Sequence, residues 1–177
     1  PLMLSHTVID IEGTDRLTGV VIAEVGPDRK PIPGTEVHYD CDTLLLSCGL
    51  IPENELSKQA EVDMNPITNG PLVDESLETN IEGVFACGNV LHVHDLVDYV
   101  SEEAAMAGKN AAHYVKERYG KDAAKSADVI DIKAVDGARY TVPTTIHLDS
   151  MADLLTVRFR VADVFKDSYI SVYFNDE

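Results

Sequence analysis

The segment TNIEGVFACGN, residues 79–89, joins a short apolar run to a turn that contains glycine. Residues 84–86, VFA, are apolar on both faces, so they predict a short buried strand. Gly88 and Asn89 follow directly, and LHVHDLVD, residues 91–98, adds two histidines and two acids. This arrangement fits the rim of a cofactor pocket, a metal site, or only a strand that ends in a turn.

The strongest helical pattern in the chain follows, over residues 96–118. Apolar residues recur at spacings of three and four: Val97, Val100, Ala104, Ala107, Ala111 and Val115. The same pattern leaves four charged side chains in solvent: Glu102, Glu103, Lys109 and Lys116. Gly108 lies inside the helix, where we expect a close neighbour to favour the missing side chain.

Upstream of this region, the sequence predicts a β-meander that extends from residue 5 to about residue 47. Its strands are expected at residues 8–11, 20–25 and 36–39. Residues 43–47, TLLLS, are continuously apolar, which favours a buried and parallel strand. Residues 49–83 are rich in loops because prolines and Gly70 interrupt them.

Beyond the helix, the pattern changes to alternation of apolar and polar residues with period two. Four segments show it: 129–133, 139–142, 155–161 and 169–174. They predict a small antiparallel sheet or half of a β-sandwich.

The composition excludes several classes of function. The chain has 177 residues, with 31 Asp and Glu against 14 Lys and Arg, and a formal net charge of -17. This balance argues against binding to nucleic acid or to anionic membranes, which needs clustered Lys and Arg. No apolar run approaches the roughly 20 residues that span a bilayer, and the N-terminus does not resemble a signal peptide. Both ends of the chain suggest a piece of something longer.

Three cysteines, Cys41, Cys48 and Cys87, form no Cys-x-x-Cys pair. An odd number of cysteines in apolar surroundings favours a reducing compartment, so we expect a cytoplasmic protein. Cys48 and Cys87 are expected to be buried as small apolar residues.

The polar residues after the turn have two interpretations. His92 and His94 with Asp95 or Asp98 form a plausible set of metal ligands. We favour the alternative, a polar loop in which Asp95 is the N-cap of the helix and Asp98 lies in its first turn, so we predict no metal.

Two segments together resemble a known family. Residues 41–53, CDTLLLSCGLIPE, resemble the strand-Gly-x-x-Pro segment at which two-dinucleotide flavoproteins return from the nicotinamide-binding domain to the FAD domain. Residues 79–89 resemble the second FAD fingerprint of the same proteins, and residues 96–118 resemble the helix after it. The chain, over about residues 5–118, therefore resembles pyridine nucleotide-disulfide oxidoreductase-like, FAD-dependent enzymes.

The resemblance implies an α/β fold, an incomplete two-dinucleotide-binding flavoprotein fold with a β-meander, buried strands and one long helix. The alternating pattern beyond this region adds a small antiparallel all-β module. The resemblance places residues 1–50 in the tail of the nicotinamide-binding domain and residues 51–120 in the C-terminal part of the FAD-binding domain. Beyond the resemblance, the residue pattern predicts a linker at 121–128 and a truncated module similar to a β-sandwich at 129–177.

The resemblance also implies FAD as cofactor, with NAD(P) possible. The residues that it assigns to cofactor binding are Gly49, Pro52, Gly88, Asn89, Leu96 and Val97. Gly88 would let the backbone approach the cofactor, and Asn89 stands where the family usually has an Asp. It names no catalytic residue, and whether His92 or His94 lines the substrate side of the flavin stays open.

No Gly-x-Gly-x-x-Gly phosphate-binding loop occurs in the chain. We therefore expect a part of an FAD-dependent oxidoreductase that is a poor flavin binder and inactive by itself. The parent enzyme would transfer reducing equivalents between a nicotinamide or organic donor and FAD. The alternative is a non-catalytic interaction or scaffold module that docks a partner subunit, and in both cases we expect self-association or a partner subunit.

Overall fold

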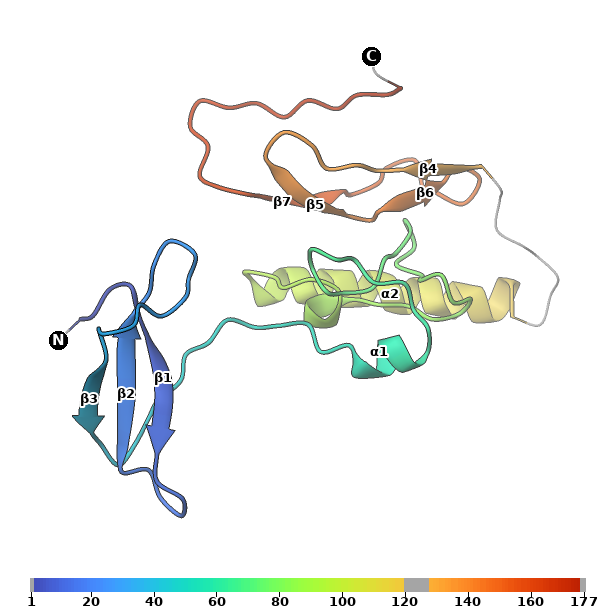
Figure 1. Ribbon diagram of the computed structural model, residues 1–177. Helices are drawn as coiled ribbons and strands as arrows, with labels where there is room; N and C mark the ends of the chain where they lie inside the picture. The colour runs from blue at the N-terminus through green and yellow to red at the C-terminus, as the bar shows by residue number, and fades with distance from the viewer. Residues whose placement is uncertain (1, 120–127, 176–177) are drawn as a thin grey trace. The chain divides into compact units, whose positions relative to one another are not determined.

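The computed structural model describes residues 2–119 and 128–175. The chain divides into two compact units, Pro1–Gly49 and Leu50–Glu177, which are described separately. Figure 1 labels their elements. Most of the predicted linker, residues 121–127, lies outside the described residues.

The first unit is a three-stranded antiparallel meander. Its strands are β1 (His6–Glu12), β2 (Gly19–Glu24) and β3 (Val37–Asp40), in the order β1-β2-β3. Val20 and Ala23 of the central strand are buried. The predicted meander is thus confirmed, because alternation and turn residues act within a few positions of each other.

The predicted strand at residues 43–47 is wrong. In the described parts of the chain these residues pair with no strand, and the side chains of Leu45 and Leu46 are 89% and 67% exposed. A continuously apolar run becomes a buried strand only when neighbouring strands and covering layers are present. The described residues supply neither.

The described residues of the second unit form three helical elements: α1 (Glu55–Gln59), the 3₁₀ turn η1 (Gly88–Val90) and α2 (Val97–Glu117). It also contains two separate two-stranded ladders. β4 (Val129–Asp131) pairs with β6 (Thr145–His147), and β5 (Ala138–Val142) pairs with β7 (Arg158–Val161). The structure is therefore mixed α/β with few helices and small antiparallel sheets.

Two further strand predictions for this unit are wrong. Residues 84–86 form only an isolated bridge, between Phe85 and Glu78, and Val84 is partly exposed. Residues 169–174 form no described strand, and Ile170 and Val172 are more than 70% exposed. In both segments the apolar pattern is present, but the described chain offers no partner strand along their length.

The core of the second unit joins segments that lie far apart in the sequence. Its buried residues are Val73, Leu77, Ala86, Leu91, Ala107, Tyr140 and Val142. The loop at 73–77, the segment at 86–91, helix α2 and strand β5 therefore share one apolar cluster. This cluster packs the middle of α2 against the segment that contains the Gly88 turn.

Helix α2 agrees with the predicted span within one residue at each end, but its buried face differs from the prediction. Only Glu103 and Ala107 of α2 are buried, whereas Val97 and Val115 are exposed. A Cβ at Gly108 would meet nothing within 4 Å, so the expected close neighbour is not there among the described residues. Periodicity gives the faces of a helix, and the packing partners decide which face is covered.

The predicted N-cap of α2 is also wrong. The cap position is Leu96, which has an extended backbone and makes no side-chain cap bond. The Asp95 carboxylate instead lies 3.0 Å from the guanidinium of Arg160 on β7. Asp95 therefore forms an ion pair with strand β7 and does not cap the helix.

A partly buried ion pair holds the C-terminal end of α2. Arg118 Nη1 donates to Glu78 Oε2 over 2.8 Å, and the N–H of Gly83 donates to the other oxygen over 2.7 Å. The Arg118 guanidinium also lies 5.1 Å from the centre of the Tyr114 ring. The loop at 78–83 is thereby attached to the last turn of the helix.

Replacing Arg118 by Met should destabilise the second unit by about 2 kcal/mol. The change removes the Arg118 cation from the 1% exposed Glu78 carboxylate, and the partial exposure of Arg118 (22%) keeps the loss below that of a fully buried pair. Lys109→Met, on the exposed side of the same helix, is the matched control and should change stability by no more than about 0.5 kcal/mol. Urea unfolding measures both; equal losses would contradict the prediction.

Candidate functional site

The site is built around the turn at Gly88. This residue has a φ of 69°, in the left-handed region that L-residues other than glycine adopt at a cost. A Cβ added there would lie 3.3 Å from Cγ1 of Val100 on α2. The turn therefore requires glycine both for its backbone conformation and for its close contact with the helix.

Glu103 of α2 lies directly behind this turn. Its side chain is fully buried, and Oε1 accepts a hydrogen bond from the Gly88 N–H over 2.6 Å. The prediction that Glu103 faces solvent is wrong. A carboxylate is tolerated in the interior only when hydrogen bonds replace the lost water, and the turn supplies one of them.

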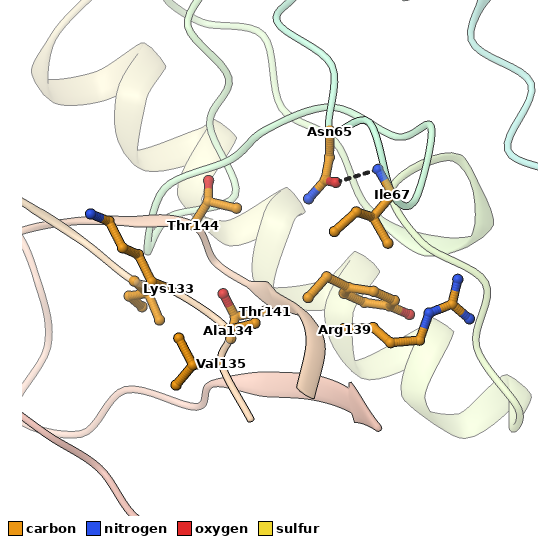
Figure 2. Close-up of a pocket in the computed structure, with 10 residues that line it drawn as sticks. Asn65, Ile67, Lys133, Ala134, Val135, Arg139, Thr141 and Thr144 are labelled. Atoms are coloured by element: carbon orange, nitrogen blue, oxygen red, sulfur yellow. Dashed lines mark hydrogen bonds between the residues drawn. The ribbon is translucent and has the colours of Figure 1, made fainter. Parts of the chain in front are cut away.

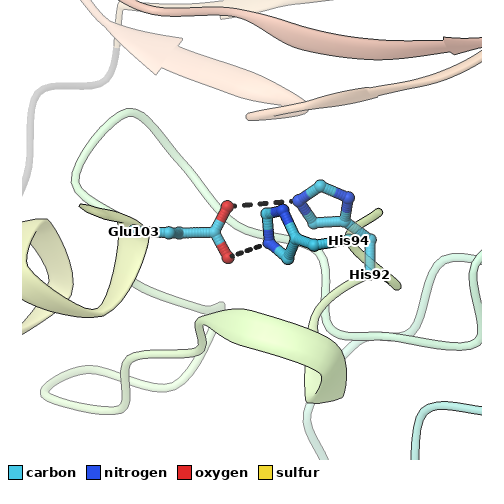
Figure 3. Close-up of side chains that lie close together, drawn as sticks. All are labelled: His92, His94 and Glu103. Atoms are coloured by element: carbon cyan, nitrogen blue, oxygen red, sulfur yellow. Dashed lines mark hydrogen bonds and ion pairs between the residues drawn. The ribbon is translucent and has the colours of Figure 1, made fainter. Parts of the chain in front are cut away.

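Two histidines supply the other close contacts. His92 Nε2 lies 3.1 Å from Glu103 Oε2, and His94 Nε2 lies 3.1 Å from Glu103 Oε1 (Figure 3). The two imidazole rings are tilted by 49° with their centroids 4.1 Å apart. The side chains are 7% and 3% exposed, so the three groups form one buried cluster, which we call the His–Glu cluster.

The electrostatics of the cluster favour an ionised Glu103. Burial is the largest influence and raises the pKa of Glu103, but hydrogen bonds from His92, the Gly88 N–H and His94 together lower the pKa below the ordinary value of 4.5. Burial, and then the charge of Glu103, raise the pKa of the Cys87 thiol. Cys87 is therefore a protonated thiol at neutral pH, and a poor nucleophile.

The cysteine predictions have different outcomes. Cys48 is exposed, which corrects the expectation that it is buried, and Cys87 is only partly buried. Cys48 directly follows the apolar run at 43–47, whose Leu45 and Leu46 are exposed in the described structure.

The ladder of β5 and β7 also contacts the cluster and the loop beside it. The hydroxyl of Tyr140 on β5 lies 3.5 Å from His92 Nδ1. On β7, Arg160 Nη2 donates to the Val93 carbonyl over 3.1 Å, and Arg158 Nη1 lies 3.9 Å from Glu103 Oε2. The site therefore combines residues from the turn, the helix and the β-module.

Four of the six predicted cofactor-binding residues lie around this turn and the start of α2. Asn89 is exposed, and its Oδ1 accepts the His94 N–H over 3.2 Å. Leu96 and Val97 are 54% and 74% exposed. Gly49 and Pro52 lie in segments without regular structure, and Gly49 belongs to the first unit. The structure leaves their predicted roles as predictions.

Glu103 is the residue that the sequence interpretation missed. The carboxylates considered beside the histidines were Asp95 and Asp98, yet the carboxylate that contacts both is Glu103. One signal was present: Glu103 lies four residues before Ala107, on the same helix face. The charge of Glu103 led to its assignment to the exposed face, because charged residues are expected in solvent.

A second acidic cluster lies where the loop at 73–77 meets β6. Glu75 accepts from the His147 N–H over 2.8 Å and from Ser150 Oγ over 2.6 Å, and His147 Nδ1 lies 3.2 Å from Glu75 Oε2. Asp74 Oδ2 lies 3.6 Å from the same ring nitrogen. These contacts join the loop to the first ladder.

The second unit also carries a shallow, open pocket of about 340 Å³ (Figure 2). The loop at 65–67 and the β-module line it, and its charged side chains are Lys133 and Arg139. Tyr140 lines the pocket and also contacts His92. No residue predicted to bind cofactor lines it.

Among residues 2–119 and 128–175, no helix has both the length and the apolar character needed to cross a membrane.

Comparisons with known proteins give the site a context. A family model described as pyridine nucleotide-disulphide oxidoreductase matches residues 3–117. Ferredoxin--NADP reductase 2 of Bacillus velezensis is 30% identical over 109 residues, which are 60% of this chain and 30% of that protein. Ferredoxin--NADP reductase of Picrophilus torridus is 26% identical over 91 residues, 51% of this chain and 26% of that protein. The chain spans less than a third of the length of these curated relatives.

Among solved structures, thioredoxin reductase of Lactococcus lactis is similar with a TM-score of 0.51 and 22% identity. The match covers 63% of this chain and 35% of that chain. At this identity the similarity concerns the fold alone.

Replacing Gly88 by Ala should destabilise the second unit by about 1–2 kcal/mol, because alanine is strained at this positive φ. Gly108→Ala is the matched control: it adds the same methyl group to α2, where a Cβ meets nothing. It should stabilise the helix by about 0.5–1 kcal/mol. Thermal unfolding of the two variants should therefore shift in opposite directions. If both substitutions shifted the unfolding temperature in the same direction, the described turn at Gly88 would be contradicted.

The second cluster should make stability depend on pH. Burial raises the pKa of Glu75, but hydrogen bonds from Ser150 and His147 lower it below the ordinary 4.5. Because the folded pKa is lower than the unfolded one, the stabilisation is complete above the unfolded value and is lost as the pH falls through the folded value. Below about pH 5, the melting temperature of the unmodified chain should fall more steeply than that of Glu75→Gln. If the melting temperatures of the two proteins fell in parallel with pH, Glu75 would not be the source of this pH dependence. Glu102→Gln, which changes an exposed glutamate, serves as the control.

Proposed function

Because the chain belongs to the pyridine nucleotide-disulphide oxidoreductase family, we propose that it forms part of an FAD-dependent oxidoreductase. The family typically binds FAD and NAD(P). The proposed enzyme transfers reducing equivalents between a nicotinamide or organic donor and FAD, and this chain supplies the second segment that contacts FAD. The bound FAD would supply the electron-transfer chemistry, while the protein binds and orients it.

The observation that carries the proposal is the geometry of the Gly88 turn. Its left-handed glycine lets the backbone turn sharply, and the following residue, Asn89, is exposed at the surface. The Asn89 amide has both a donor and an acceptor, which fit the hydroxyl groups of a ribityl chain. Because the amide is neutral, its bond to a hydroxyl is weaker than that of a carboxylate.

The start of α2 supports the same assignment. Leu96 and Val97 present apolar side chains to solvent, which suits the face of a flat aromatic ring. The first N–H groups of a helix have no partner inside it, and their dipole favours a nearby negative charge. A flavin that becomes anionic on reduction would benefit from this end of the helix. Gly49 and Pro52 belong to the proposed set through the resemblance of residues 41–53.

A second candidate function, an interaction module, is favoured by exposed apolar residues in both units. Leu45 and Ile51 are 89% and 76% exposed, and Tyr169 and Phe174 are 89% and 74% exposed. Contiguous exposed apolar surface is typical of surfaces that another chain covers. Self-association or a partner subunit is therefore part of the proposal.

The test uses the whole protein that the reading frame encodes. Its affinity for FAD is measured by quenching of flavin fluorescence. Asn89→Ala should weaken binding about tenfold, the value of one hydrogen bond of about 1.4 kcal/mol. Asn89→Asp should strengthen it, because the acceptor becomes charged.

Lys109→Ala, on an exposed part of the same helix, is the control and should leave the affinity unchanged. Melting temperatures of the three variants separate a loss of binding from a disturbed turn, since Asn89 also accepts the His94 N–H. Absence of FAD binding, or equal affinity in all variants, would overturn the flavin assignment and favour the interaction module.

A further inference from the structure

The His–Glu cluster has the donor atoms of a metal site, and the proposed flavin function does not use them. One ligand atom from each of His92, His94 and Glu103 lies within 4.8 Å of the other two. All three side chains are more than nine-tenths buried. Two imidazoles and a carboxylate at such separations form one of the common ligand sets for a divalent transition metal.

The distances suit a small tetrahedral ion. Zn²⁺ binds histidine nitrogen and carboxylate oxygen at about 2.0–2.2 Å, so neighbouring ligand atoms lie about 3.4 Å apart. Each Nε2 lies 3.1 Å from an oxygen of Glu103. Both separations are therefore within a few tenths of an ångström of the spacing between ligands of such an ion.

Groups around the cluster already hold the ligands in place. The Gly88 N–H fixes Glu103 Oε1, and the Tyr140 hydroxyl lies 3.5 Å from Nδ1, the second nitrogen of His92. Outer hydrogen bonds of this type orient metal ligands and set which ring nitrogen faces the ion. The positive charge of Arg158, whose Nη1 lies 3.9 Å from Glu103 Oε2, opposes the binding of a cation. Glu102 offsets this charge, because its Oε2 lies 3.6 Å from Arg158 Nη2.

The cluster at Glu75 is less suited to a metal. It offers one imidazole, and both Glu75 oxygens already accept short bonds, from Ser150 Oγ and from the His147 N–H. Asp74 Oδ1 accepts from the N–H and the hydroxyl of Ser76. A metal there would have to displace several of these donors.

We propose that His92, His94 and Glu103 bind one divalent transition-metal ion of the zinc type. Three protein ligands leave the fourth tetrahedral position for a water molecule. The ion ties the Gly88 turn and the loop after it to α2. This inference goes beyond the proposed flavin function and does not depend on it.

The experiment starts with the full chain, stripped of metal by a chelator and then titrated with Zn²⁺. Atomic spectrometry after dialysis should find one Zn²⁺ per chain. Co²⁺ in its place should give the intense visible absorption of a tetrahedral site. His92→Asn, His94→Asn and Glu103→Gln should each weaken Zn²⁺ binding at least about tenfold.

Two matched controls locate the ion. His113→Asn changes an exposed histidine of the same helix, and Glu75→Gln changes the second cluster. Both should bind Zn²⁺ as the unmodified chain does. Glu103→Gln keeps an oxygen that accepts the Gly88 N–H, and circular dichroism checks that each variant is folded.

Three results would overturn the site: no Zn²⁺ retained by the unmodified chain, retention unchanged in all three cluster variants, or loss caused by Glu75→Gln. The Co²⁺ spectrum of the unmodified chain decides the question even if a variant does not fold. FAD affinity, measured on the same samples, separates the two proposals, because the metal site can fail while flavin binding is retained.

Discussion

The buried carboxylate of Glu103 is the constraint on which the second unit depends. A charge without water is costly, so the protein must surround it with donors. The Gly88 N–H and the two histidine rings fill this role, and each comes from the segment that precedes α2. The turn, the histidine loop and the helix are therefore coupled, because separating any one of them would remove hydrogen-bond donors from the buried charge.

The β-module takes part in the same arrangement. Tyr140 and Val142 of β5 belong to the apolar cluster that includes Ala107 of α2, and Arg160 of β7 binds Asp95 and the Val93 carbonyl. Apolar burial supplies the general attraction between these elements, while the polar contacts fix their register. The segment after Gly88 is thus covered by chain that lies more than 40 residues further along the sequence.

Local features were predictable because they depend on near neighbours. The meander of the first unit follows from alternation and turn residues, and α2 follows from apolar spacing to within one residue at each end. Strands at 43–47, 84–86 and 169–174 were not predictable in this way. An apolar run indicates that a segment can be buried, but a strand also needs a partner along its length. In the described residues these segments have none, apart from the single bridge at Phe85.

The sequence alone determined the family, the place of α2 and the need for a turn at Gly88, since spacing and residue type act locally. Only the tertiary structure decided that Glu103 is buried and that it joins His92 to His94. A helix pattern ranks faces by their apolar content, so it assigns a glutamate to solvent. The burial of that glutamate becomes favourable only when distant backbone and side-chain donors meet it, and their meeting is a property of the folded chain.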